Sequence, residues 1–310
     1  MFNKSFLVKR IVNSLLKRDY EVLLTHGCFD IAAKHVSRRR QLNRSRQLML
    51  IKALVNIDSL NQQHAMSLRA VSYFMSAYPF VVSMKNNREF LNDKMVYSRF
   101  SLPVVTPNLF ESILEDEAYA YESAKGRHTV VINTKALREK RIEMQFTLEE
   151  LARLVGVSKK ALYEIESNRV NPTERTAKRL ENTLNIKLRS VYTPKIAEET
   201  RLKPANAFQS RVSKELNRIG IDNSPLQAST VEIVGKEEFS VLTALSKNGV
   251  KIKREAETVK KLSSIFSSHA FFVAKKAKEQ EVEGVSVLLE DELLEVESAK
   301  ELRKLIEEKQ

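Results

Sequence analysis

The chain has 310 residues, of which 43% are hydrophobic and 29% charged, so it can bury a sizeable core, and its length suggests about two or three domains. Lysine and arginine total 52 against 39 acidic residues, giving a formal charge of +13 and a pI near 9.6. This surplus favours a polyanionic partner such as nucleic acid or an anionic membrane surface. With only 7 glycines, the chain contains neither GxGxxG nor GxxxxGK[ST], which excludes the usual Rossmann and P-loop nucleotide sites.

Cysteine and histidine usage argues against disulfide and metal chemistry. The single cysteine, Cys28, excludes an intramolecular disulfide framework and any cysteine-based zinc finger. The five histidines are scattered and form no HExxH motif: His26, His35, His64, His128 and His269. We therefore expect neither a metal nor a cofactor.

The N-terminal segment alternates charged and apolar residues with a helical period, unlike the uninterrupted apolar stretch of a signal peptide. No window approaches the roughly 18 uncharged apolar residues that a membrane span needs. These patterns predict a soluble, cytoplasmic protein without a membrane partner.

Residues 1–125 are expected to form a small α/β domain. An apolar stripe at i, i+4 spacing from Leu7 to Leu15 predicts an opening helix. The β-rich runs EVLLTHGCFDIAA and QLMLIKALVNI follow, then a helix in SLRAVSYFMSAY and short strands in PFVVSM and LPVVT. A last helix, PNLFESILEDEAYAYES, has Thr106 as its N-cap and Pro107 at its first position.

Residues 204–310 form a second α/β block, which follows the linker VYTPKIAEETRLKPAN. Its runs follow the order of the first block: FDIAAK resembles VEIVGK, LMLIKAL resembles FSVLTAL, and AVSYFMSAYPFVVSMK resembles KLSSIFSSHAFFVAKK. The matching order and lengths over about 70 residues favour a duplicated domain over two unrelated segments.

Charge is unevenly distributed along the chain. The insert KHVSRRRQLNRSR at Lys34–Arg46 carries six basic residues and no acidic one, whereas the last 32 residues are strongly acidic. Either segment can be an ordinary solvated face. For the arginine insert, and its Arg38–Arg46 part in particular, the alternative is a flexible arm that binds phosphates.

The central block, residues 133–192, has the most specific pattern. Thr147 and Glu150 form a T-x-x-E capping box that opens one helix, and Gly156 ends this helix where a sharp turn needs positive φ. The apolar positions within this helix are Leu148, Leu151, Ala152 and Val155. Ser158 then caps the next helix.

In that next helix Ala161, Leu162 and Ile165 are expected to face inward, with charged and tyrosine side chains outward. The segment Asn171–Glu174 (NPTE) predicts another helix start, with asparagine as cap and proline at the first position. Short helices around a glycine turn in a basic chain predict a helix-turn-helix.

The segment from about Leu137 to Val191 resembles the lambda-repressor-like, Cro/cI-type helix-turn-helix family. The resemblance rests on LEELARLVGVS, on the recognition-helix ending IES and on the connection NRVNP. It implies a helix from Ser158 to Ser167 that lies in the major groove of double-stranded DNA. The alternative is a four-helix module that serves only protein contacts.

The family geometry implies roles for individual residues. Lys159 and Lys160 would read bases or phosphates, and Glu164 could accept from cytosine N4. Hydroxyls and backbone N–H groups at helix N-termini suit phosphates. The expected DNA-contact residues are Thr147, Leu148, Ser158, Lys159, Lys160, Tyr163, Glu164, Arg169, Asn171 and Thr173. The family often has glutamine where this chain has Leu148, which removes one polar contact.

The flanking α/β pattern resembles the restriction-endonuclease-like fold. Its active members hold Mg²⁺ with a carboxylate followed by Asp/Glu-x-Lys on the next strand. The first block has Asp30 and Lys52, but Leu50 stands where the second acid belongs. In the second block Glu232 matches Asp30, and the aligned residues 242–244 (Leu-Thr-Ala) provide neither acid nor lysine. We expect two degenerate nuclease-like domains without catalytic residues, the alternative being a Mg²⁺-dependent nuclease that uses Asp30 and Lys52.

The N-terminal α/β domain ends in SAKGRHTVVINTKALREKR and is followed by the helix-turn-helix. In this combination, and over nearly its full length, the chain resembles a family of archaeal helix-turn-helix transcriptional regulators. The prediction is a non-enzymatic, sequence-specific regulator that binds double-stranded DNA. Because related helix-turn-helix proteins bind pseudo-palindromes as dimers, we expect a homodimer whose interface the α/β domains could supply. The remaining alternative is a non-specific architectural DNA- or RNA-binding protein driven by the arginine insert.

Overall fold

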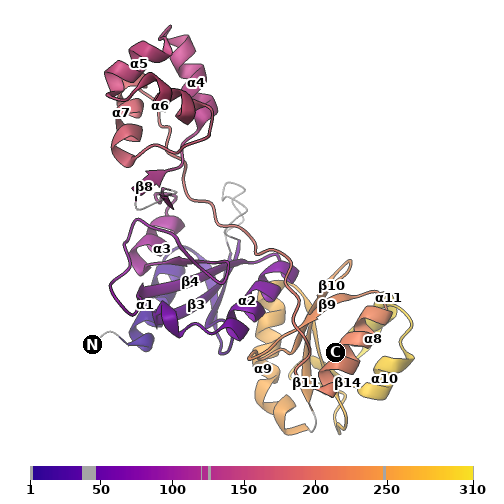
Figure 1. Cartoon of the computed structure of the whole chain (residues 1–310). Coiled ribbons are helices and arrows are strands. Elements are labelled where there is room, and N and C mark those ends of the chain that lie inside the picture. The colour runs from indigo at the N-terminus through magenta and orange to yellow at the C-terminus, as the bar shows by residue number, and fades with distance from the viewer. Residues whose placement is uncertain (1–2, 37–46, 120, 125–126, 247–248, 310) are drawn as a thin grey trace. The chain divides into compact units, whose positions relative to one another are not determined.

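The computed structural model describes residues 3–36, 47–119, 121–124, 127–246 and 249–309 (Figure 1). The arginine insert at residues 37–46 lies outside these ranges. The chain divides into two compact units, one of Met1–Phe90, Ser98–Pro107 and Pro194–Gln310, the other of Leu91–Tyr97 and Asn108–Thr193. Most of the two α/β blocks therefore belongs to one unit, which we call the α/β unit. The other unit holds the central block together with residues 91–97 and 108–125, which were expected in the first block. Among the described residues, no helix is long and apolar enough to cross a membrane.

The first lobe of the α/β unit is a mixed six-stranded sheet in the order β1-β2-β3-β4-β6-β5. Its elements are α1 (Lys4–Leu16), β1 (Tyr20–Leu24), β2 (Ile31–His35), β3 (Leu48–Asn56), the 3₁₀ turn η2 (Ile57–Ser59), α2 (Gln62–Phe74), β4 (Tyr78–Lys85), β5 (Tyr97–Arg99) and β6 (Leu102–Val105). The stripe from Leu7 to Leu15 is buried on α1, as the apolar spacing predicts.

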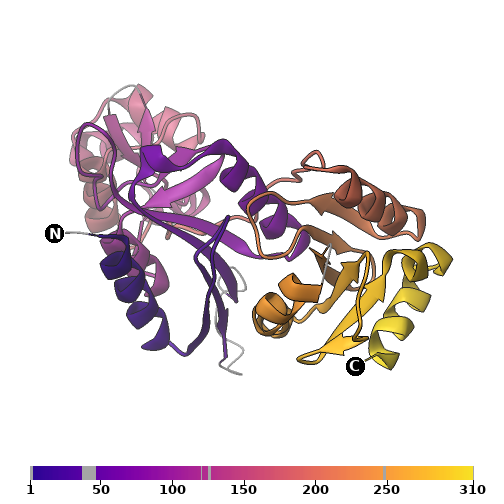
Figure 2. The same ribbon diagram turned by 90° about the horizontal axis from the view of Figure 1, so that it is seen from below.

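The second lobe is another six-stranded sheet, in the order β13-β14-β12-β11-β10-β9. Its elements are α8 (Ala207–Arg218), β9 (Asp222–Pro225), β10 (Ile233–Lys236), β11 (Ser240–Ser246), α9 (Gly249–Phe266), β12 (His269–Ala274), β13 (Glu281–Val282), β14 (Val285–Leu289), α10 (Glu290–Glu295) and α11 (Ala299–Glu308). Helices α8, α10 and α11 share one core with the strands, and α9 packs against β11 and β12 (Figure 2).

The two sheets have the same topology. In each, the first three strands pair antiparallel and the third, fourth and sixth pair parallel. The backbone register agrees as well, because the N–H of Asp30 donates to Ile51 and the N–H of Glu232 donates to Thr243, at 2.9 and 3.0 Å. Asp30 and Glu232 are therefore equivalent positions, and Lys52 is equivalent to Ala244.

Two expected elements of the first block have different limits. The run EVLLTHGCFDIAA holds two strands, β1 and β2, which pair as a hairpin. The helix that begins at Pro107, α3 (Pro107–Leu114), is shorter than predicted, because Asp116 has φ +60° and the N–H groups of residues 117 and 118 both donate to the Ser112 carbonyl. The chain then forms a strand, β7 (Tyr121–Ala124), where more helix was expected.

The predicted linker after the central block is tied to both lobes of the α/β unit. The N–H of Ala197 donates to Ser72 Oγ of the first lobe at 3.0 Å. The N–H of Leu202 donates to Ser224 Oγ of the second lobe at 3.1 Å. Residues 194–204 are therefore a strap across the α/β unit.

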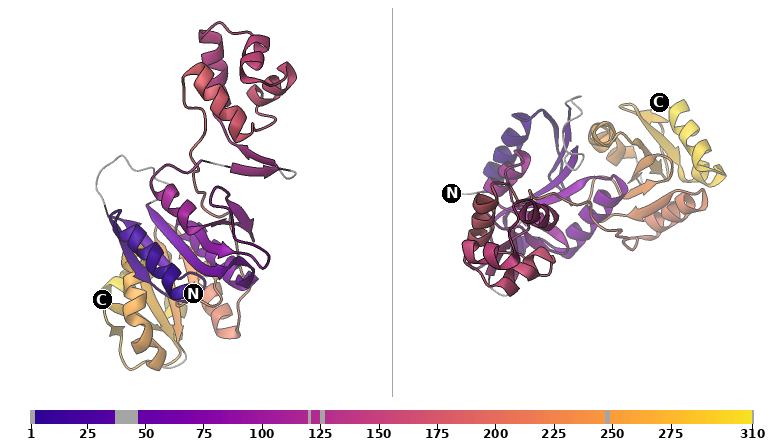
Figure 3. Two further views of the ribbon diagram at one scale, coloured as in Figure 1. Left: turned by 90° about the vertical axis from the view of Figure 1, so that its left-hand side faces the viewer. Right: turned by 90° about the horizontal axis from the view of Figure 1, so that it is seen from above.

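Besides α3, the central unit contains the hairpin of β7 and β8 (Arg127–Val130) and four further helices: α4 (Thr134–Glu143), α5 (Leu148–Val155), α6 (Lys159–Glu166) and α7 (Glu174–Leu184). Figure 3 shows these helices as a compact bundle. One apolar cluster joins them, including Leu137, Leu151, Leu162 and Leu180, each fully buried. The chain thus combines α/β lobes with a helical module whose core includes Tyr121 and Val130 of the hairpin.

Candidate nucleic-acid interface

The first helix of the helix-turn-helix, α5, begins at the predicted capping box. The N–H of Glu150 donates to Thr147 Oγ1 at 3.2 Å, and the N–H of Thr147 donates to Glu150 Oε2 at 2.8 Å. These hydrogen bonds from the Thr147 backbone and hydroxyl lower the pKa of Glu150. The carboxylate therefore stays ionised at the positive end of the helix, where charge of this sign is favourable.

The turn between the two helices depends on Gly156. Its φ of +75° is left-handed, and its N–H donates to the Ala152 carbonyl at 2.9 Å. A Cβ at this position would lie 2.8 Å from Arg179 Nη1, which itself donates to the Val155 carbonyl at 3.1 Å. Glycine thus suits the left-handed backbone, and the missing Cβ leaves room for the end of the Arg179 side chain.

The candidate recognition helix, α6, begins at Ser158, whose Oγ accepts the N–H of Ala161 at 3.1 Å. Leu162 and Ile165 are buried on its inner side, as the spacing predicts. The opposite side is exposed at both lysines of the first turn and at Tyr163. The helix therefore offers its N-terminal turn and one polar face to a partner.

The two lysines of this first turn differ in their surroundings. Lys159 Nζ lies 3.6 Å from Glu149 Oε2, and both side chains are largely exposed. Among the described residues, Lys160 forms no ion pair. Such an exposed pair contributes little to stability, so both ammonium groups are available to an anion.

The exposed face of α6 continues into a cluster around Tyr163. Arg169 Nη1 lies 3.3 Å from Glu164 Oε1, and the guanidinium lies 5.6 Å from the centre of the Tyr163 ring. Three of the expected contact residues are thus brought together. Glu164 is engaged with an arginine, which leaves it less free to accept from a base.

The three cap hydroxyls, expected to meet phosphates, already bond within the protein. Thr147 Oγ1 is 2.8 Å from Glu150 Oε2, so this hydroxyl both accepts from and donates to the same residue. Thr173 Oγ1 accepts the N–H of Thr176 and is 3.0 Å from that residue's hydroxyl. Ser158 accepts one N–H and keeps its own proton, so of the three it has the most freedom to donate.

The start of α7 differs from the prediction. Its N-cap is Thr173 rather than Asn171, and Pro172 precedes the helix instead of opening it. The reason is the neighbouring hairpin: the Pro172 carbonyl accepts the N–H of Val130 at 2.9 Å, and Thr173 bridges to Thr129. This pairing holds Pro172 in line with strand β8.

Leu148, which stands where the family often has glutamine, is half-buried and packs against the apolar core of the unit. Its side chain contributes to stability, so the site has one polar group fewer.

Two partly buried contacts that brace the unit were not predicted. Arg141 on α4 forms two hydrogen bonds with Glu166 at the end of α6, at 2.6 and 3.1 Å. Glu181 on α7 accepts from the N–H groups of Leu188 and Arg189 and from the Arg189 guanidinium. Burial would raise the pKa of Glu181, but these donors lower it. No spacing in the sequence marks either contact, because both depend on how helices cross.

The nuclease-like position of the first lobe is occupied by ammonium groups. Asp30 Oδ1 lies 2.7 Å from Lys4 Nζ and 3.3 Å from Lys52 Nζ, and Oδ2 accepts the N–H of Ala53 at 2.9 Å. Leu50, where a second acid would stand, is fully buried. One carboxylate that already binds two cations does not fit a divalent metal, which needs several free oxygen ligands.

The second lobe has a carboxylate–lysine pair at the equivalent place. The N–H of Leu245 donates to Glu232 Oε2 at 2.8 Å, and Lys251 forms an ion pair with Oε1. Burial raises the pKa of Glu232, although Lys251 opposes this shift. The lysine comes from α9 and not from the strand, so sequence alignment with Lys52 misses it. Among the described residues, no three His, Cys, Asp or Glu side chains gather to hold a metal.

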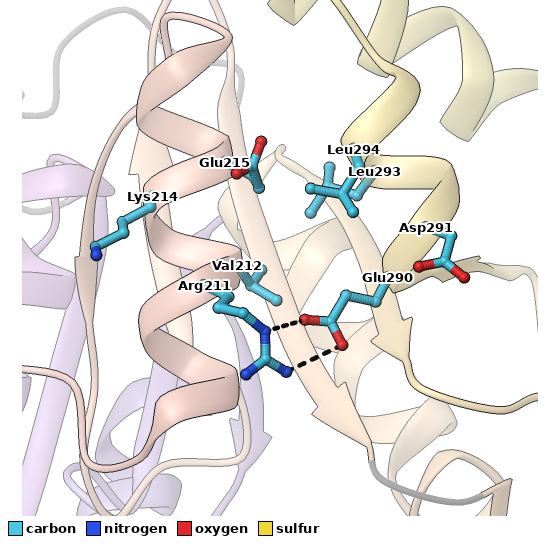
Figure 4. Close-up of a pocket in the computed structure, with 8 residues that line it drawn as sticks. All are labelled: Arg211, Val212, Lys214, Glu215, Glu290, Asp291, Leu293 and Leu294. Atoms are coloured by element: carbon cyan, nitrogen blue, oxygen red, sulfur yellow. Dashed lines mark hydrogen bonds and ion pairs between the residues drawn. The ribbon is translucent and has the colours of Figure 1, made fainter.

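A pocket of about 340 Å³ on the second lobe lies between α8 and α10 (Figure 4). The Arg211 guanidinium faces the Glu290 carboxylate across it, with Nε to Oε1 at 2.6 Å. Its remaining charged lining residues are Lys214, Glu215 and Asp291. Because acids outnumber bases here, the pocket does not suit a phosphate.

Comparison with known proteins places these features in families. A helix-turn-helix family model matches residues 137–191, and a PD-(D/E)XK superfamily domain model matches residues 4–119. A protein of Methanothermobacter thermautotrophicus named "Putative HTH-type transcriptional regulatory protein" is 30% identical, covering 95% of this chain and 96% of the relative. A protein of that type from Pyrococcus abyssi is also 30% identical, covering 97% of this chain and 95% of the relative.

The chain belongs to this family of archaeal proteins named as HTH-type transcriptional regulatory proteins. Another relative so named, from Methanocaldococcus jannaschii, is 25% identical and covers 97% of this chain and 96% of the relative. No solved structure matches the chain. The matches confirm the resemblance to archaeal helix-turn-helix regulators and the fold class of nuclease-like α/β and helix-turn-helix domains.

Proposed function

We propose that the chain is a sequence-specific regulator of transcription that binds double-stranded DNA with α6 in the major groove. The observation that supports this most directly is the exposed N-terminal turn of α6, where Lys159 and Lys160 stand beside the Ser158 cap on a rigidly braced helix. In helix-turn-helix complexes this turn faces base edges, and lysine donates to guanine O6 and N7.

The other proposed contacts surround this turn. Tyr163 and Arg169 extend the exposed face, and Ser158 retains a proton to donate. Thr147 and Thr173 would approach phosphates through the N-terminal ends of α5 and α7, whose backbone N–H groups suit anions. The remaining proposed contacts are Leu148, Glu164 and Asn171.

We further propose that the protein acts as a homodimer on an inverted repeat. Two recognition helices related by a two-fold axis would read half-sites about 34–36 Å apart, or a multiple of this distance. A DNA footprint of this periodicity would support the dimer, and a single unrepeated half-site would contradict it.

We also propose that the protein does not cleave DNA. This proposal is supported by the ion pairs at both nuclease-like positions. Asp30 pairs with Lys4 and Lys52, and its equivalent Glu232 pairs with Lys251. An ammonium group at each carboxylate competes with a divalent cation for the same oxygens. Plasmid nicking that needs Mg²⁺ and disappears in Asp30→Ala would overturn this proposal.

The test of DNA recognition compares two kinds of variant. Replacing both lysines by alanine, in Lys159→Ala/Lys160→Ala, should weaken specific binding by about 1–3 kcal/mol per lost good contact. Deleting residues 38–46 should weaken binding to all sequences alike. The matched control is Lys135→Ala, which removes an exposed lysine from α4. If the deletion abolishes binding and the double variant has no effect, the non-specific architectural alternative is favoured.

A further inference from the structure

The two lobes of the α/β unit meet through reciprocal elements. Helix α2 of the first lobe contacts β10 of the second, and α9 of the second contacts β2 of the first. By strand order α2 corresponds to α9, and β2 to β10. The same pair of elements is therefore used in both directions, which is the arrangement of an isologous, two-fold dimer.

The backbone contact at the centre of this seam joins equivalent residues. Gly27 lies three positions before Asp30, and Ser229 lies three positions before Glu232, the equivalent of Asp30. Gly27 and Ser229 form an antiparallel bridge with each other. In a two-fold arrangement, residues that meet their own equivalents mark the position of the axis.

The seam is tightly packed and hydrogen-bonded at this point. A Cβ on Gly27 would lie 2.3 Å from the carbonyl oxygen of Ala228 in the other lobe. Ser67 Oγ donates to the Gln227 carbonyl at 2.8 Å and accepts the Gln227 N–H at 3.0 Å. The segment Gln227–Ser229 of the second lobe is thus held from both sides.

Lys52, at the position of the nuclease lysine, contacts Gly27 on the first-lobe side of the seam. Lys52 Nζ donates to the Gly27 carbonyl at 2.5 Å while it pairs with Asp30. Lys52 and Asp30 are only 5% and 7% exposed, so their charges are satisfied inside the protein. In the second lobe Lys251 donates to the Leu245 carbonyl instead, at 3.1 Å.

We infer that the α/β unit is an internal dimer of two nuclease-type lobes, and that the Asp30–Lys52 pair positions Gly27 to hold the seam closed. The ammonium fixes the carbonyl of Gly27, and this residue in turn pairs with Ser229. The surface suited to a second lobe is already filled by this chain's own second lobe. A homodimer of whole chains would therefore use a different face.

Cys28, the only cysteine of the chain, reports on the seam. Its thiol is fully buried, and Ser229 of the other lobe is one of the groups that influence its pKa. Burial raises the pKa of this thiol to about 11, so an aromatic disulfide reagent should label the closed protein slowly. Opening of the seam would expose the thiol and speed the labelling.

The decisive comparison uses two glycines with left-handed backbone. In full-length Gly27→Val, the native labelling rate should rise at least about tenfold, because the new side chain meets Ala228. In Gly220→Val it should change less than about twofold, because a Cβ there meets no atom within 4 Å although φ is +94°. Equal rates in the two variants would overturn the inference.

The lysine provides a second, independent test if Gly27→Val fails to fold. Lys52→Met should speed labelling, and Lys52→Arg, which keeps the charge, should label more slowly than Lys52→Met. Lys251→Met, which removes the lysine paired with Glu232 in the second lobe, should leave the rate unchanged. Loss of the Lys52 charge would itself raise the thiol pKa and slow the reaction, so faster labelling can come only from opening. Labelling of Lys52→Met at the wild-type rate would contradict the positioning role, whether or not the protein binds DNA.

Discussion

Arg141 on α4 and Glu166 at the end of α6 form a partly buried ion pair with two hydrogen bonds, Nε to Oε1 at 2.6 Å and Nη2 to Oε2 at 3.1 Å. Their side chains are 13% and 7% exposed, and Nη1 also donates to the carbonyl of Phe146. The pair joins the first helix of the module to the last turn of the candidate recognition helix. It therefore fixes the direction of α6 against the bundle.

The first prediction concerns this pair. Arg141→Met leaves the Glu166 carboxylate buried without its partner, so it should lower the free energy of unfolding of the helix-turn-helix unit by about 3–5 kcal/mol. Hydrogen exchange of the α6 amides measures this loss. The control is Lys135→Met, whose exposed pair with Glu139 spans 3.9 Å and should matter by less than about 1 kcal/mol. Equal effects of the two variants would contradict the bracing role.

The second prediction concerns the turn of the helix-turn-helix. Gly156→Ala places a Cβ in the left-handed region and 2.8 Å from Arg179 Nη1, so it should destabilise the unit by about 1–2 kcal/mol. Gly156→Asn should cost less, since asparagine tolerates this backbone region better. Thermal melts of both variants measure the difference. A Gly156→Ala protein as stable as the wild type would show that the turn tolerates another backbone conformation.

The third prediction concerns pH. The hydrogen bond from Lys178, supported by Lys94 and opposed by partial burial, lowers the pKa of Glu174 to about 2. A carboxyl whose folded pKa is depressed stabilises the fold above its ordinary pKa of 4.5, and this contribution is lost as pH falls toward 2.

Melting temperatures of wild type and Glu174→Gln, measured from pH 7 to pH 2.5, test this directly. The wild type should melt higher at neutral pH, and the difference should shrink between about pH 5 and pH 2. Glu139→Gln, at an exposed position on α4, provides the control and should change little at any pH. A Glu174→Gln difference that stays constant with pH would refute the assigned pKa.

The fourth prediction concerns the nuclease-like lobes. Supercoiled plasmid incubated with the protein and Mg²⁺ or Mn²⁺ should remain supercoiled, because the Asp30 oxygens are bound by two lysines and a backbone N–H. Asp30→Ala should therefore leave plasmid integrity unchanged while it destabilises the fold by removing the partner of the buried Lys52. Nicking by the wild type alone would instead assign Asp30 to catalysis.

The features that could be predicted from the sequence are those set within a few residues. The Thr147–Glu150 capping box, the left-handed Gly156 and the Ser158 cap each depend on local hydrogen bonds and backbone angles, and the structure has all three. The N-cap of α7 was misplaced at Asn171 because the carbonyl of Pro172 pairs with a hairpin distant in sequence.

The ion pairs could not be predicted, because tertiary packing decides them. Lys4 reaches Asp30 across 26 residues, and Lys251 reaches Glu232 from a helix rather than from a strand. No sequence pattern identifies Lys4 as the partner of Asp30, or Lys251 as the partner of Glu232. The sequence predicted the loss of a nuclease carboxylate at Leu50, but not that lysines bind the carboxylate that remains.

The central claim is that α6 reads DNA sequence, and in vitro selection tests it most directly. Random double-stranded DNA is bound to the full-length protein at about 0.2 M salt, where non-specific phosphate binding is weak, and the retained fragments are sequenced. The wild type and Lys135→Ala should enrich an inverted repeat, whereas Lys159→Ala/Lys160→Ala should not. Uniform recovery of sequences by the wild type, or the same enriched repeat with the double variant, would contradict it.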